Sequence, residues 1–209
     1  MRPPLPADAR RARLPQLRRQ VLPADAADGS PRRRVPRDVV PPLLAQPHVL
    51  AAREELGESV SLAVLESDEA VFVARADAQR IVSAGVRLGA RLPAHASATG
   101  RVLLAGLPDD QVDAVLERAD LRASTPNTLT SVAEIRERVR RARTEQMAYT
   151  DEELELGMRT MAVPVRDSQG RVRAAMSVAA FTARISLPAM KATFAPILRE
   201  HAERLGRML

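Results

Sequence analysis

The chain has 209 residues, of which 45% are apolar, 28% charged and 2% aromatic, which suits one globular domain, or one domain with a tail, and excludes a coiled-coil rod. It contains no cysteine, so a disulfide framework, a thiolate nucleophile and a cysteine-ligated zinc are excluded, and a cytoplasmic protein is the default expectation. The longest uncharged run, residues 39–52, holds three prolines and is too short and too interrupted to span a membrane.

The net charge of +6 belongs entirely to the start of the chain. Residues 1–40 hold ten arginines and four aspartates, and the other 169 residues are neutral overall. Ten of the sixteen prolines lie within residues 1–47, without a periodic apolar pattern, so we expect a basic, largely disordered tail over residues 1–44. Its arginine runs suit either a solvated tail or weak contact with phosphates, although no aromatic residue lies among them to stack on bases.

A helix followed by an antiparallel meander is expected next. Apolar residues recur at helical spacing from about residue 46 and end at Gly57, a common helix stop. Strands are predicted over residues 59–65, 70–74 and 80–86, the first two joined by a polar turn.

Three helices are predicted after the meander. One, rich in small residues, covers residues 97–105, and a short one follows Pro108, where proline and two aspartates suit a helix start. The third begins at Ser131, and Glu134 completes a capping box with that serine.

The last third of the chain contains a hairpin and a helix. Strands over residues 158–165 and 171–179 flank a turn at residues 167–170 and are expected to pair. A helix then begins at Ser186, and its apolar stripe comprises Leu187, Met190, Phe194, Ile197, Leu198, His201, Leu205 and Met208. This order of elements predicts an α+β fold.

No constellation of catalytic or metal-binding residues stands out. The histidines have no metal-ligand spacing, and glycine-rich phosphate-binding motifs are absent, so we expect no catalytic residue, metal or cofactor. His95 precedes Ser97, but no nucleophile elbow surrounds that serine, and residues two apart on a helix do not face each other. The acidic run at residues 151–155 lacks the spacing of a calcium loop and is expected to face water.

One face of the strand over residues 171–179 carries unusually small side chains, those of Ala175, Ser177 and Ala179. Such a row either lets a helix approach closely or leaves room for a ligand, to which Ser177 offers a hydrogen bond. Thr160 on the partner strand and Thr99 on the small-residue helix add uncharged hydroxyls. This lining suits binding a small polar molecule more than transforming it.

Three stretches resemble a known family: GARLPAHASATGRVLLA at residues 89–105, DEELELGMR at 151–159 and AVPVRD at 162–167. They are similar to the effector-binding domain of IclR-type bacterial transcription regulators, and the resemblance runs in order over residues 45–209. Within that family, the chain looks most like regulators of aromatic-acid catabolism, the protocatechuate and 4-hydroxybenzoate branch.

The resemblance implies a GAF-like domain over residues 45–209, with a curved antiparallel sheet of about six strands, helices on its faces and contacts that form dimers or tetramers. It also implies a buried pocket for a small carboxylate effector, an aromatic or keto acid. Carried over by position, the pocket would be lined by Ile81, Ala84, Ala98, Thr99, Thr160, Ser177 and Ala179. Hydroxyls and N–H groups at the helix start would bind the carboxylate, with Arg80 as a candidate counter-ion. A cysteine that is common in the family at Thr160, and a serine that is common at Ala179, are absent.

Family members begin with a winged helix-turn-helix that reads DNA, and residues 1–44 show no trace of it. We therefore expect a sensor domain that has lost its DNA reader through truncation or a frame shift, an interpretation favoured by 31 arginines against one lysine. DNA is then a partner only if a winged helix is supplied, and no membrane partner is expected. The alternatives are weak, non-specific nucleic-acid binding through the tail, and an enzyme on a GAF-like scaffold.

Overall fold

The computed structural model describes residues 40–79 and 86–209. Within them, helices and strands alternate in a mixed order. The helices are α1 (Pro42–Leu56), α2 (Ala98–Ala105), α3 (Asp109–Arg118), α4 (Val132–Glu145) and α5 (Leu187–Gly206). The strands are β1 (Ser59–Glu66), β2 (Glu69–Ala76), β3 (Arg91–Pro93), β4 (Ala148–Asp151), β5 (Met158–Arg166) and β6 (Val172–Phe181). The tail expected over residues 1–44 and the strand expected over residues 80–86 lie largely outside the described residues.

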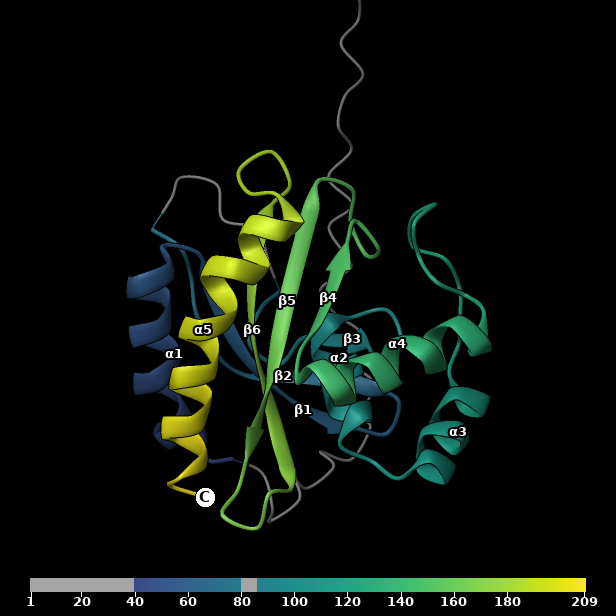
Figure 1. Cartoon of the computed structure of the whole chain (residues 1–209), viewed down its shortest axis with the longest axis horizontal. Coiled ribbons are helices and arrows are strands. Elements are labelled where there is room, and N and C mark those ends of the chain that lie inside the picture. Colours follow the sequence, from purple (N-terminus) through teal and green to yellow (C-terminus); the bar gives the residue numbers. More distant parts are fainter. Residues whose placement is uncertain (1–39, 80–85) are drawn as a thin grey trace, which may run out of the picture. The chain divides into compact units, whose positions relative to one another are not determined.

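The six strands form one sheet in the order β3-β2-β1-β6-β5-β4, and every neighbouring pair is antiparallel. β1 and β2 run across the direction of β5, so the sheet is strongly twisted (Figure 1). The predicted α+β class and the antiparallel sheet of about six strands are confirmed. None of the described helices has the length and apolar composition needed to cross a bilayer.

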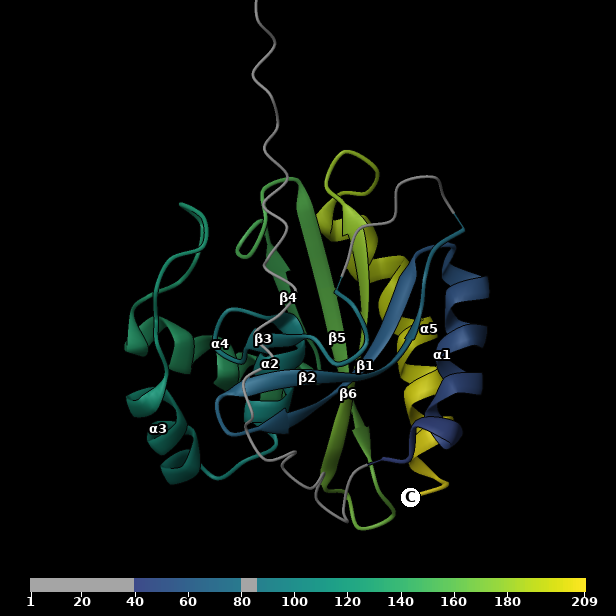
Figure 2. The ribbon, with the colours of Figure 1, turned by 180° about the vertical axis from the view of Figure 1, so that it is seen from behind.

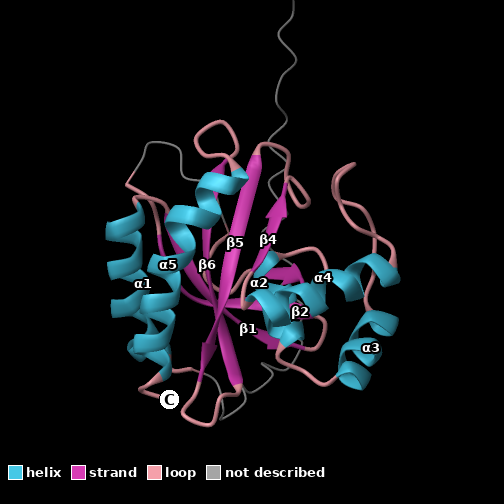
Figure 3. Cartoon of the chain, in the orientation of Figure 1, coloured by secondary structure: helices cyan, strands magenta, loops and turns pink. Residues whose placement is uncertain are grey.

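The two faces of the sheet carry side chains of different size. One face holds large apolar residues such as Leu62, Met176 and Val178, which pack with α1 and α5. The opposite face holds small ones, Ala63, Ala162 and Ala175 among them, which pack with residues of α2, α3 and α4. Figure 3, and Figure 2 from behind, show α1 and α5 together on one side of the sheet and α2 to α4 on the other. The predicted alternation along β6, with small residues on one face, is confirmed.

Most predicted elements are present. The helices expected at residues 97–105, after Pro108, from Ser131 and from Ser186 are observed, and β5 and β6 pair as the expected hairpin. Gly57 ends α1 in the left-handed conformation with φ of 65°, where glycine carries no Cβ penalty. α1 begins earlier than its apolar pattern indicates, because proline is well tolerated in the first turn of a helix, where its missing N–H costs no bond.

Four details differ from prediction. Ser131 precedes α4, but its side chain makes no capping hydrogen bond, so the capping box is wrong. Met208 lies past the end of α5 and is exposed, so it does not belong to the apolar stripe. β4 was not predicted, because four residues are too few to show a strand period. The described outer neighbour of β2 is β3, which the sequence pattern did not indicate.

Candidate effector-binding site

α2 lies along the small-residue face of the sheet. At its C-terminal end, Gly106 lies so close to Val172 that an added Cβ would come within 2.6 Å of the valine Cβ. Val172 begins β6, and α2 contacts both β5 and β6, while Ala98 in the first turn of α2 belongs to the same buried cluster as Ala162 and Ala175. The alanines on this face allow the helix to approach closely, and further along the strands the face continues with hydroxyl side chains.

The start of α2 is held by its own cap. The Oγ atom of Ser97 accepts a hydrogen bond from the N–H of Gly100 at 3.1 Å and donates one to the carbonyl oxygen of Pro93 at 2.9 Å. Thr99 donates from Oγ1 to the same serine oxygen at 3.4 Å. The first-turn N–H groups of Ala98 and Thr99 have no intrahelical acceptor, and such groups favour an anion in front of the helix.

Hydroxyl residues from four strands share the same face, and we term them the hydroxyl face. Thr150 of β4 lies opposite Thr160 of β5, and their Oγ1 atoms are 2.6 Å apart. Strand pairing places Ala179 beside Thr160, and Ser59 beside Ala179. The next register positions bring Ser177 opposite Ser61. The hydroxyl face comprises Ser59, Ser61, Thr150, Thr160 and Ser177.

An arginine reaches the hydroxyl face from β2. Arg75 lies opposite Ser61 in the strand register, and its Nη1 donates to Ser61 Oγ at 2.9 Å. Its Nε donates to Asp77 Oδ1 at 2.8 Å, and its Nη2 lies 2.6 Å from the same oxygen. A positive charge therefore lies beside a row of neutral hydroxyls.

Five of the seven predicted lining residues lie in the part of the chain that the structure describes. Ala98 and Thr99 are buried at the start of α2, Ser177 is buried on β6, and Thr160 and Ala179 are partly exposed beside it. The other predicted residues, Ile81, Ala84 and the candidate counter-ion Arg80, lie outside the described residues.

Sequence reasoning missed three residues of the hydroxyl face, Ser59, Ser61 and Thr150. It also missed Arg75 beside them. Ser59 and Ser61 carried a usable signal, because they alternate with Val60 and Leu62 at the period of a strand. Thr150 belongs to the strand that is too short to detect, and Arg75 is assigned to this face only by its pairing with Ser61.

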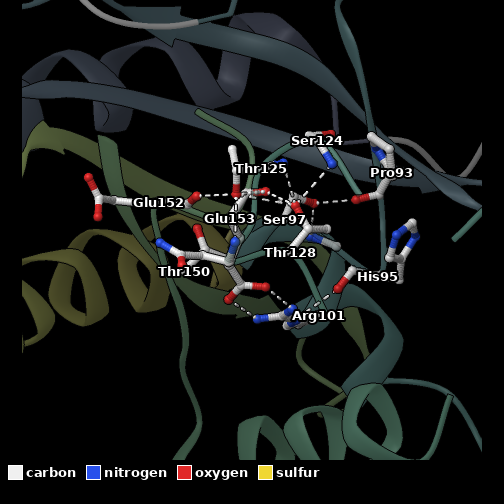
Figure 4. A network of polar contacts seen from close by, with 12 residues as sticks. Pro93, His95, Ser97, Arg101, Ser124, Thr125, Thr128, Thr150, Glu152 and Glu153 are labelled. Carbon is white, nitrogen blue, oxygen red and sulfur yellow. Dashed lines mark hydrogen bonds and ion pairs between the residues drawn. The ribbon is translucent and has the colours of Figure 1, made fainter. Parts of the chain in front are cut away.

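A buried polar network joins α2 to the segment that follows β4 (Figure 4). Arg101 donates from Nη1 and Nη2 to the two carboxylate oxygens of Glu153, at 2.7 and 2.5 Å, and from Nε to the carbonyl oxygen of His95 at 2.8 Å. Thr128 donates to the carbonyl oxygen of Glu153, and Thr125 to that of Glu152. The expectation that the whole acidic run faces water is therefore wrong at Glu153, which is buried because it pairs with a buried guanidinium.

The His95 ring is buried and takes no part in this network. Neither ring nitrogen has a hydrogen-bond partner among the described residues, and Figure 4 shows the ring directed away from Arg101. Burial, and after it the charge of Arg101, holds the pKa of His95 below its ordinary value of 6.5. Since Ser97 donates to Pro93, the two side chains form no nucleophile and base pair. The described residues contain no group of three or more candidate metal ligands.

The mixed order of helices and strands around one antiparallel sheet defines a domain of the α+β class. The chain belongs to the IclR family of transcription regulators: it matches the family described as "Bacterial transcriptional regulator IclR C-terminal" over residues 43–207. This confirms the resemblance, and it assigns the chain to a family of regulators, not of enzymes.

Individual relatives refine this assignment. A Pca regulon regulatory protein of Pseudomonas putida is 36% identical over 155 residues, which cover 74% of this chain and 53% of that protein. The inducer-binding domain of the Acinetobacter PobR transcription factor, solved as a double mutant with 3-hydroxybenzoic acid, has a TM-score of 0.76 and 32% identity, covering 80% of this chain and 98% of that chain. An IclR homologue from Microbacterium hydrocarbonoxydans, solved with 4-hydroxybenzoate, has a TM-score of 0.70 and 30% identity, covering 78% and 65%.

The solved structures share the fold of this chain, which confirms the predicted GAF-like domain. The predicted likeness to regulators of aromatic-acid catabolism is confirmed as well. The chain spans only 53% to 62% of the length of the first three curated relatives that it matches.

Proposed function

We propose that residues 45–209 form an effector-sensing domain that binds a small aromatic carboxylate at the hydroxyl face and the first turn of α2. The observation that carries the proposal is the row of strand hydroxyls on the face of the sheet against which α2 packs, seen most directly in the 2.6 Å contact between Thr150 and Thr160. Relatives solved with 3-hydroxybenzoic acid and 4-hydroxybenzoate support the aromatic class.

The chemistry of the face suits recognition of a polar aromatic acid. Helix N–H groups and hydroxyl protons donate to carboxylate oxygens, and the short side chain of the partly exposed Ala179 among them suits an adjacent ring. On the hydroxyl face itself, no nucleophile has a base beside it. We therefore expect the ligand to be bound and released without a chemical reaction. The lining proposed from the sequence, Ile81 and Ala84 included, remains part of this proposal.

Thermal and chemical unfolding with added 3-hydroxybenzoate or 4-hydroxybenzoate tests the proposal. A ligand at 100 times its dissociation constant stabilises the folded state by about 2.7 kcal/mol. Thr160→Val is expected to weaken binding about tenfold, since it removes a hydroxyl and leaves the shape. The matched control is Thr193→Val, an exposed threonine on α5 whose hydroxyl bonds only to the carbonyl of Ala189. If neither hydroxybenzoate raises the unfolding midpoint, the aromatic class is wrong.

The same proposal extends to the complete regulator. We place it in the cytoplasm, with copies of this domain in contact and effector binding transmitted through those contacts to DNA binding, as the regulatory names of its relatives suggest. Sedimentation velocity with and without hydroxybenzoate checks the assembly. A dimer or tetramer is expected, and a monomer at every concentration would contradict this part of the proposal.

A further inference from the structure

We infer that Arg75 is the specificity-determining residue by which the site distinguishes an anionic effector from a neutral molecule of the same shape. The inference rests on the proposed function. It gives a role to a side chain that is not among the lining residues implied by the family resemblance.

The position of Arg75 follows from the strand register. Its neighbours Ala74 and Ala76 pack into the large-residue core, so Arg75 lies on the opposite side of β2, the side of Ser61. The 2.9 Å bond from Nη1 to Ser61 Oγ carries the guanidinium over β1. Ser61 in turn lies opposite Ser177, and side chains directly opposite each other in a sheet are about 5 Å apart at Cβ. The guanidinium thus lies beside Ser61, one strand away from Ser177, so it borders two of the five residues of the hydroxyl face.

The Arg75 guanidinium is buried, whereas Asp77, its carboxylate partner among the described residues, lies in solvent. The Arg75 side chain is 9% exposed, whereas that of Asp77 is 60% exposed. Water screens the exposed carboxylate much more than the buried guanidinium, so the positive potential dominates on the inner side. The hydroxyl face itself consists of neutral serines and threonines, which respond to charge far less than a guanidinium does.

A carboxylate and its amide differ little in size but fully in charge. A guanidinium forms charge-assisted hydrogen bonds with a carboxylate that are roughly twice as strong as neutral ones. The hydroxyls donate to either ligand through ordinary hydrogen bonds, and the helix N–H groups favour the anion less than a guanidinium does, because a helix N-terminus carries only about half a unit charge. Arg75 therefore supplies most of the difference in affinity, and the change in the ratio of the two affinities when Arg75 is replaced measures its role.

The test is calorimetric titration of the full chain with 4-hydroxybenzoate and with 4-hydroxybenzamide near neutral pH. The wild-type chain should prefer the acid. Arg75→Met should lower affinity for the acid by about ten- to hundredfold and change that for the amide by less than about threefold. Arg75→Lys should keep part of the preference for the acid. Lysine keeps the positive charge but cannot donate the two parallel hydrogen bonds of a guanidinium to a carboxylate. Asp77→Asn should increase the preference, because the competing carboxylate is removed.

The matched control is Arg91→Met on β3. Arg91 pairs with Glu66 and Glu69 at the edge of the sheet, and its loss should leave the ratio of acid to amide affinity unchanged. If Arg75→Met binds the acid with the wild-type ratio, the inference is overturned while the proposed function stands. If the wild-type chain binds neither compound, the proposed function fails and the inference with it. If Arg75→Met does not fold, Asp77→Asn decides, and an unchanged ratio there overturns the inference.

Discussion

The guanidinium of Arg101 and the carboxylate of Glu153 are joined by two parallel hydrogen bonds across 52 positions of sequence. Arg101 is 1% exposed and Glu153 is 9% exposed. The pair connects α2, whose first turn belongs to the candidate site, with the segment that follows Thr150 on β4. A buried ion pair therefore fixes α2 relative to the end of β4, two parts of the candidate site that lie far apart in the sequence.

Removing one partner of this pair should be strongly destabilising. Glu153→Leu leaves a buried guanidinium without its counter-charge, which costs about 3–5 kcal/mol of unfolding free energy. Urea denaturation measures this, and the double variant Arg101→Met with Glu153→Leu should recover much of the loss, since no buried charge remains.

The exposed pair of Arg141 and Glu145 on α4 is the control. Glu145→Leu should change the unfolding free energy by no more than about 1 kcal/mol, because solvent screens this pair. A Glu153→Leu chain as stable as the Glu145→Leu chain would show that the buried pair contributes little.

The acidic run shows where sequence reasoning reaches its limit. Its spacing gives no indication that Glu153 meets Arg101, because the pairing depends on how β4 and α2 come together. Glu155 is exposed, whereas Asp151 is only partly exposed and accepts two hydrogen bonds from Arg159, so the expectation of a solvated run is correct only in part. The exception depends on a tertiary contact, which local pattern does not encode.

The local sequence pattern was sufficient to predict the long helices and strands. The period of two along β6 predicted its small-residue face, and Gly57 and Ser186 marked the end of α1 and the start of α5. The hydroxyl face was only half predicted, because strand register decides that Thr150 meets Thr160 and that Arg75 meets Ser61. Register is a property of the folded sheet and cannot be read from one strand.

His95 should make stability decrease in mild acid. Its pKa in the folded state is held below 6.5, chiefly by burial. Well above pH 6.5 the ring is neutral in both states and contributes no pH dependence. As pH falls below that value, the unfolded chain binds a proton that the folded chain refuses, so the free energy of unfolding falls until the folded pKa is reached.

His95→Leu removes this titration. Because the buried ring has no described hydrogen-bond partner, the variant should be as stable as the wild type near neutral pH, or more stable by about 1 kcal/mol. The advantage of the variant should grow between about pH 7 and about pH 5. Urea denaturation across this range measures the difference, and parallel curves for the two chains would refute the prediction.

Lys191 and Tyr149 form a contact that secures the edge strand β4. The Lys191 Nζ atom lies 3.6 Å from the centroid of the Tyr149 ring, which joins α5 to β4. At a partly exposed site such a cation–π contact contributes about 0.5–1 kcal/mol. A double-mutant cycle with Tyr149→Leu and Lys191→Met should give a coupling energy of that size, whereas Tyr149→Phe keeps the ring and should retain the coupling. A coupling near zero would mean that the two side chains are neighbours without mutual stabilisation.

Gly100→Ala tests how tightly the start of α2 is packed. Helix propensity alone predicts that alanine stabilises a helix position by up to about 1 kcal/mol relative to glycine. An added Cβ, however, would lie 2.2 Å from the Ala94 Cα and 2.3 Å from its carbonyl oxygen, and backbone atoms cannot move aside as a flexible side chain does. The substitution should therefore cost about 1–3 kcal/mol in unfolding free energy and displace the first turn of α2.

Thr193→Ala on the exposed face of α5 isolates the propensity effect, and its unfolding free energy should lie within about 0.5 kcal/mol of that of the wild type. Because the first turn of α2 belongs to the proposed site, Gly100→Ala should also weaken hydroxybenzoate binding, and a stabilised variant with unchanged binding would show that this turn has room to spare.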